Sequence, residues 1–226
     1  MFESIKEARI ALAPVTQGAS PDIARDVEAL LQVLAIAEAA KSQSDVLSPA
    51  EITDIGEQGF ALIDDLTSKL ALGQREAERQ QVEQVSLVIA QWVIAHRGVL
   101  TNIQSVVNAL AQLSNTISDP TLLSQLVAFM GQVAHACSEA IKRDLDNANP
   151  ARPWRVLNFN RGITATRSHD LELMRATFPE LIAAIPLDAP DFFKEGMSEM
   201  VRLNYPESVH ELMKEFYLRA TRPVAH

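Results

Sequence analysis

Residues 84–138 form a stretch of 55 residues with only two formally charged side chains, Arg97 and Asp119. From residue 82 to residue 117, apolar side chains recur at alternating spacings of three and four, which is typical of α-helices. Helical surfaces in water normally carry Lys and Glu, because their charged groups stay hydrated and resist association. We therefore expect helices that are covered on most sides, either by the rest of the fold or by a second copy of the chain.

Three helix starts are marked by a capping side chain followed by proline. They are Ser20-Pro21, Ser48-Pro49 and Asp119-Pro120. Ser48 and Glu51 also have the spacing of a capping box. Aromatic residues make up only 5% of the chain, and Ala, Leu and Val supply much of its apolar content, which favours helix over strand. The sequence predicts an all-α fold, a layered bundle of about eight or nine helices.

Two features inside this pattern bear on how the helices pack. Gly56 and Gly59 lie within the helix that follows Ser48, where each costs about 1 kcal/mol relative to Ala, so they predict a close helix contact. Residues 74–117 form either one long heptad helix or two helices. The pair Arg97-Gly98 resembles a helix end and residues 101–104 have capping-box spacing, which favours two.

The helical pattern is interrupted at residues 147–153, where two prolines rule out a continuing helix. We expect residues 1–146 to form an N-terminal helical bundle and residues 147–169 to form a crossing segment containing Arg and Trp. Residues 170–226 are expected to form shorter helices packed on the same core, so that the whole chain is one domain.

Helix starts are also predicted within this last part. Ser168 is expected to cap a helix that Pro179 interrupts. Helices opened by Pro190 and by Pro206 are expected to form a C-terminal helical hairpin.

Charge and cysteine content limit the partners. The net charge is −9, and residues 1–147 carry all of it, so we expect neither nucleic acid nor a membrane as partner. Cys137 is the only cysteine, which excludes an internal disulfide, and its apolar surroundings predict a buried structural thiol. The N-terminus lacks the pattern of a signal peptide and no apolar run reaches the ~20 residues of a membrane span, so a cytoplasmic location is expected.

The segment 147–169 contains four arginines and no acidic residue, a local charge of +4 in an acidic protein. Guanidinium groups suit carboxylate or phosphate, Trp154 and Phe159 offer flat apolar faces, Gly162 permits a tight turn, and a helix start at Ser168 offers free N–H groups. The candidate binding residues are Arg152, Trp154, Arg155, Asn158, Asn160, Arg161, Arg167 and His169. The alternative interpretation is that these arginines pair with the protein's own acids while the apolar residues pack against the helices.

Other patterns are weaker. His96 is the polar member of an apolar stripe and is interpreted as a hydrogen-bonded core residue or, alternatively, as a proton-transfer group. Glu207 and His210 have the spacing of a metal-binding pair, but no second pair exists, so neither a metal nor a cofactor is predicted. The Met and Phe stripe of residues 192–201 is interpreted as core, with a partner groove as the alternative.

No motif in the sequence establishes a reaction. We expect a non-catalytic protein-interaction or scaffold module that binds an acidic protein through the Arg/Trp segment and forms a homodimer through residues 84–138. The alternative is a helical enzyme or carrier for a phosphorylated or carboxylated small molecule. There the four arginines hold the anion, and His169 or His96 moves a proton.

Overall fold

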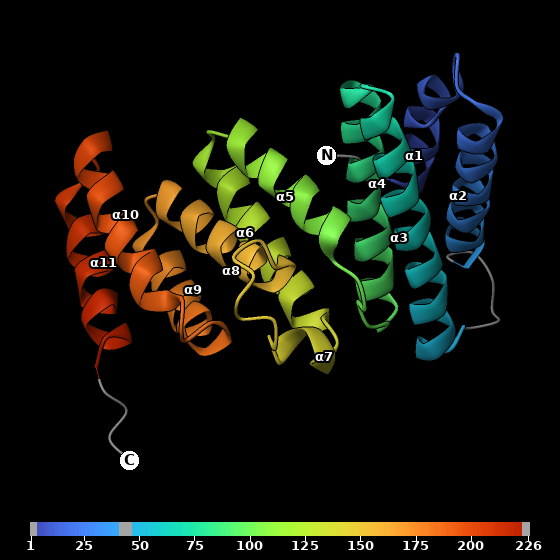
Figure 1. The fold of residues 1–226 in the computed structure, drawn as a ribbon. Helices are drawn as coiled ribbons and strands as arrows, with labels where there is room; N and C mark the ends of the chain where they lie inside the picture. The colour runs from blue at the N-terminus through green and yellow to red at the C-terminus, as the bar shows by residue number, and fades with distance from the viewer. Residues whose placement is uncertain (1–3, 41–46, 223–226) are drawn as a thin grey trace. The chain divides into compact units, whose positions relative to one another are not determined.

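The computed structural model describes residues 4–40 and 47–222, which are helical and contain no β-strand (Figure 1). The helices are α1 (Ile5–Ala11), the 3-10 helix η1 (Ala13–Thr16), α2 (Pro21–Ala40), α3 (Pro49–Leu72), α4 (Glu76–Ala95), α5 (Gln104–Thr116), α6 (Pro120–Ala136), α7 (Glu139–Lys142), α8 (Pro153–Arg167), α9 (Leu171–Ala184), α10 (Ala189–Leu203) and α11 (Glu207–Ala220). The all-α prediction is confirmed. The described residues form eleven α-helices and not eight or nine, because α1 and α7 are only 7 and 4 residues long and give no readable periodicity.

The chain divides into two compact units. One comprises Met1–Leu113 with His135–Ile141, and the other comprises Ser114–Ala134 with Lys142–His226. The first unit therefore contains α1 to α4 and most of α5. The second contains most of α6 and all of α8 to α11.

The three helix starts marked by capping residues are confirmed at Pro21, Pro49 and Pro120. Ser48 Oγ accepts a hydrogen bond from the Glu51 N–H at 3.3 Å, and the Glu51 carboxylate accepts from the Ser48 N–H at 2.8 Å. Both halves of the capping box are thus formed, and two N–H groups that lack a partner inside the helix are satisfied.

Residues 74–117 form two helices, as the favoured prediction stated. α4 ends at Ala95, and Arg97 then adopts a left-handed backbone with φ of 61°. Gly98 follows at a close approach, because a Cβ placed on it would lie 2.7 Å from Ile52 Cγ2. The N–H of Gln104, which opens α5, donates to the side chain of Asn102 at 3.1 Å.

In the first unit α3 packs closely along α4, and the two glycines of α3 face it. A Cβ on Gly56 would lie 2.5 Å from Val93 Cγ2, and one on Gly59 would lie 2.8 Å from Ile89 Cδ1. Real Cβ atoms do not come so close to their neighbours. The predicted close helix contact is confirmed, and it explains why α3 tolerates two residues of poor helix propensity.

A buried carboxylate explains part of the charge-poor stretch. Glu83 of α4 is only 1% exposed, and it pairs with Arg79 one turn earlier. It also accepts hydrogen bonds from Asn108 at 3.2 Å and from Gln112 at 2.6 Å, both on α5. The neutral amides on α5 therefore satisfy a buried charge, which lysines pointing to water would not do.

The expectation that the neutral polar residues are covered holds only in part. Gln112 is half-buried, whereas Gln91 and Gln104 are exposed in the single chain. The homodimer through residues 84–138 stays a prediction. Cys137 is buried, as predicted for a structural thiol, and lies where Leu100 exchanges backbone hydrogen bonds with Ala136 and Ser138.

The core of the second unit is a cluster of phenylalanine rings from α9, α10 and α11. Phe178, Phe192, Phe193 and Phe216 contact one another with ring centroids 5.1 to 6.3 Å apart. α10 and α11 pack side by side and are joined by a turn at Asn204, which has a φ of 54° (Figure 1). None of the helices in the described part of the chain is long and apolar enough to cross a membrane.

Candidate functional site

Within the Arg/Trp segment, residues 153–167 form a helix, α8. Pro153 occupies its first turn, where proline needs no N–H partner. Apolar periodicity is weak because three buried positions carry polar side chains, each of which donates to the backbone carbonyl four residues earlier. Asn158 donates to the carbonyl of Trp154, Thr164 to that of Asn160, and Thr166 to that of Gly162. Such bonds allow polar side chains on a buried helical face.

Two predictions about this segment are wrong. Ser168 does not cap the next helix, since it ends α8, and Asp170 caps α9 through bonds from the N–H groups of Glu172 and Leu173. Gly162 does not form a turn, since it lies within α8. A Cβ on Gly162 would lie 2.5 Å from Phe192 Cζ and 2.7 Å from Leu181 Cδ1, so this glycine allows close packing on α9 and α10.

Arg152 and Arg155 meet at one carboxylate, Asp188. Arg152 is buried, binds Asp144 in a bidentate manner at 2.6 and 2.8 Å, and also donates to Asp188. Arg155 donates to Asp188 at 2.7 Å and to the carbonyl of Pro150 at 3.0 Å, and its guanidinium lies 4.0 Å from the centre of the Phe159 ring. Two acidic residues of the chain thus occupy both guanidinium groups.

The neutral members of the predicted site face inward. Trp154 is 7% exposed and donates from its indole N–H to the carbonyl of Ala184 at 3.0 Å. Asn158 is buried and bonded within α8. Asn160 is half-buried, and its Nδ2 has no hydrogen-bond partner among the described residues.

The remaining basic residues lie apart from this pair. Arg161 donates to Glu180 of α9 at 2.5 Å, and its guanidinium lies against Gly131 of α6. Arg167 donates to the carbonyl of Ser114 and, at 2.7 Å, to that of Ile117, at the C-terminal end of α5. A cation there satisfies carbonyls that lack a partner within the helix.

His169 is exposed and stacks edgewise on Tyr205 with ring centroids 4.6 Å apart. The eight predicted residues therefore share one helix and its ends but do not converge on one cleft. The geometry agrees with the alternative interpretation, in which the arginines pair with groups of the chain itself. The binding of an acidic partner through them stays a prediction.

Asp188 gives this network a dependence on pH. Burial by itself would raise the pKa of Asp188, but hydrogen bonds from Arg155 and Arg152 and their positive charges outweigh burial and hold the pKa below its usual value. Since the folded-state pKa lies below that of the unfolded chain, the carboxylate stabilises the fold above about pH 4, and this contribution is lost as the pH falls through the folded-state pKa.

We expect Asp188→Asn to lower the free energy of unfolding by about 2 kcal/mol at neutral pH. The difference between wild type and variant should shrink as the pH falls below about 4, because the wild-type side chain becomes protonated and neutral. Urea denaturation at a series of pH values measures this difference. Asp191→Asn, an exposed position in the first turn of α10, is the control, and an Asp188→Asn difference that stays constant with pH would contradict the assignment.

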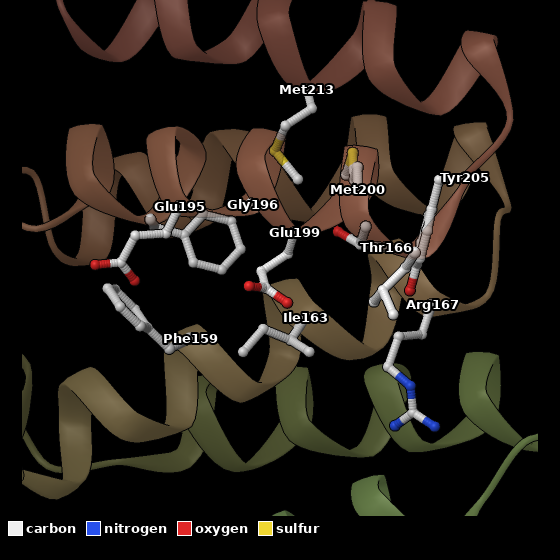
Figure 2. A pocket seen from close by; sticks show the side chains of 12 residues that line it. Phe159, Ile163, Thr166, Arg167, Glu195, Gly196, Glu199, Met200, Tyr205 and Met213 are labelled. Atoms are coloured by element: carbon white, nitrogen blue, oxygen red, sulfur yellow. The ribbon is translucent and has the colours of Figure 1, made fainter.

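An open cavity of about 310 Å³ lies in the second unit between α8, α10 and α11. We refer to it as the α8–α10 groove. Its apolar lining is Phe159, Ile163, Phe192, Met200, Leu203 and Met213, and the remaining lining residues are Thr166, Arg167, Glu195, Gly196, Glu199 and Tyr205. Figure 2 shows Met213 reaching into the groove from α11, and Glu195 and Glu199 reaching from α10 towards Phe159 and Ile163 of α8.

The two ends of the groove differ. At one end Phe159 of α8 contacts Phe192 of α10, with ring centroids 5.1 Å apart, and this contact closes that end of the groove. The other end carries Leu203, which is 54% exposed, and Tyr205. Burial raises the pKa of Tyr205, and the charge of Arg167 offsets part of that effect.

The prediction that the stripe of residues 192–201 is core is confirmed for Phe192, Phe193 and Met200, which are at most 5% exposed. Phe192 and Met200 also line the groove, and Val201 is 74% exposed. The excess of apolar residues on α10 and the isolated Ile163 of α8 are the sequence signals for this site. A single packed face cannot bury all of them.

No group of three or more His, Cys, Asp or Glu side chains suited to a metal ion occurs within residues 4–40 and 47–222. Comparisons with protein-family models, with curated proteins and with solved structures gave no match to this chain.

Proposed function

We propose that this chain is a non-catalytic protein-interaction module and that its partner docks in the α8–α10 groove. The observation that carries the proposal is the exposure of two apolar side chains of the groove lining. Ile163 is 44% exposed and Leu203 is 54% exposed, while Phe192, Met200 and Met213 form the buried base of the groove. An apolar patch that is open to water and rimmed by polar residues is typical of a surface that binds another protein.

The chemistry of the lining supports binding and not a reaction as the task of the groove. Most of it consists of hydrocarbon, aromatic rings and the thioethers of Met200 and Met213. Thioether side chains adapt their shape and are common on surfaces that receive apolar residues of a partner. The proposal keeps the interaction module expected from the sequence but moves its binding surface from the arginines to the groove, since the arginines already have partners within the chain.

A carrier of an apolar small molecule is the second candidate, favoured by the size of the cavity. About 310 Å³ lies within the range of small-ligand sites, which are mostly apolar with a few polar groups. A thermal-shift screen with straight-chain acyl compounds tests this candidate, since a ligand that binds only the folded chain raises its melting temperature.

The interaction module is tested by selecting random peptides displayed on phage against the purified chain. We expect the selected peptides to carry several large apolar residues. The double variant Ile163→Asn with Leu203→Asn should weaken their binding at least tenfold, on the order of the loss expected when two interface anchors become polar. Fluorescence anisotropy with the labelled peptides measures the change.

The matched control is Leu187→Asn with Leu218→Asn. These two leucines are 74% and 50% exposed and lie in the same unit but do not line the groove. The control variant should bind the selected peptides as the wild type does. Equal losses in both double variants, or a selection that yields no peptide sensitive to the groove variant, would reject the groove as a protein-docking site.

A further inference from the structure

We propose that the partner segment is an amphipathic α-helix whose apolar stripe is flanked by Lys or Arg, and that Glu195 and Glu199 receive these basic residues. This inference rests on the proposed function and specifies the chemistry of the partner. It depends on the backbone requirements of a bound peptide, on the length of the groove and on the charges along its rim.

The lining of the groove selects a helix over an extended peptide. An extended peptide leaves its own N–H and C=O groups without partners unless a strand edge supplies them. The described residues form no β-strand, and the groove walls are helices whose backbone bonds are internal. A helix satisfies its own backbone and presents only side chains, so it suits a groove whose exposed apolar side chains are Ile163 and Leu203 above the buried Met200 and Met213.

The length of the groove fits about three helical turns. Along α10 the lining extends from Phe192 to Leu203, a rise of about 17 Å at 1.5 Å per residue. A facing helix covers that distance with apolar residues at positions i, i+4, i+7 and i+11. The first of these apolar residues lies at the closed end, beside Phe159 and Phe192, and the last lies at the open end, beside Leu203.

The charges along the rim select a basic partner. Glu195 and Glu199 lie one helical turn apart on the side of α10 that faces α8 (Figure 2). Glu195 has no ion pair among the residues that the structure describes, and Glu199 pairs with Arg202, both side chains being more than half exposed. Arg167 also lines the groove, but Figure 2 shows its guanidinium pointing away, towards the carbonyls that it binds at the end of α5.

An acidic helix would therefore meet carboxylates of its own sign, whereas a basic one would gain two exposed ion pairs. Since Arg202 competes for Glu199, Glu195 should contribute more to binding than Glu199 does. This preference is opposite in sign to the acidic partner expected from the arginine segment.

The test uses three labelled peptides of about 18 residues, a length at which a helix can form on binding. All three carry the same Leu stripe, and the flanking positions are all Lys, all Gln or all Glu. We expect the Lys peptide to bind most tightly and the Glu peptide most weakly. The double variant Glu195→Gln with Glu199→Gln should weaken the binding of the Lys peptide about threefold to tenfold, in line with the loss of two exposed ion pairs. The affinity for the Gln peptide should not change.

The control variant is Glu207→Gln with Glu211→Gln, which removes the same charge at the same spacing from exposed positions on α11 outside the groove. It should bind all three peptides as the wild type does. Equal binding of the Lys and Glu peptides, or equal effects of the two variants, would overturn the basic helix. The proposed function would still stand if the double variant Ile163→Asn with Leu203→Asn weakened the binding of the Gln peptide. If that variant had no effect, the proposed function would be rejected as well.

Discussion

Replacing Arg152 by Met should lower the free energy of unfolding by about 3 kcal/mol and the melting temperature by roughly 10 °C. Met retains much of the length of the side chain, so the loss comes mainly from the charge. Without the guanidinium, the carboxylate of Asp144 loses its bidentate partner, and Asp188 keeps only Arg155. Both carboxylates are largely buried, with 12% and 20% of their side chains exposed, so each becomes costly when its partner is removed.

A second variant separates this cause from lost packing. Arg152→Met with Asp144→Asn should recover about 1 kcal/mol relative to the single change, because the unpaired charge is gone. Arg175→Met is the control, since Arg175 and Glu215 form a pair with nearly half of each side chain exposed, and it should cost less than about 0.5 kcal/mol. Urea denaturation measures all three. If Arg152→Met leaves stability unchanged, Arg152 is free for a partner, as the sequence had suggested.

The sequence predicted the fold well wherever local signals act alone. The capping box at Ser48 and the break at Arg97-Gly98 depend on residues that are neighbours in the chain. The helix that Pro206 was expected to open is also present, as α11. α8 was missed because its buried Asn158 and Thr166 read as polar surface positions, whereas their side chains bond to the backbone of the same helix.

The site was harder to predict than the fold because it depends on distances between helices. A run of four arginines with a net local charge does not reveal that Asp188 and Glu180, far along the chain, lie within reach of it. The groove is set by how far α10 stands from α8, and no pattern in the sequence encodes that distance. The stripe of residues 192–201 had indicated a groove as an alternative interpretation. Ile163, an apolar residue of α8, lines the opposite side of the groove and was not used in that prediction.

Gly162→Ala should lower the free energy of unfolding by about 2 kcal/mol, although alanine is the better helix former. The added Cβ would lie 2.5 Å from Phe192 Cζ and 2.7 Å from Leu181 Cδ1. Both neighbours are buried, and the Phe192 ring is held by Phe178 and Phe193, so the ring cannot move away without disturbing the core. Overpacking of this kind costs about 1–3 kcal/mol, which exceeds the gain in helix propensity of up to about 1 kcal/mol.

Gly196→Ala is the matched change on α10 and should have the opposite sign. Its Cβ would lie 3.0 Å from the terminal methyl of Met213, which is flexible and borders the groove, so it can move by a few tenths of an ångström. The gain in helix propensity then stabilises the chain by up to about 1 kcal/mol. Thermal and urea denaturation of the two variants measure the contrast. If both alanines stabilise the chain, α8 does not lie as close to Phe192 as the structure places it. The groove would then not be closed at that end.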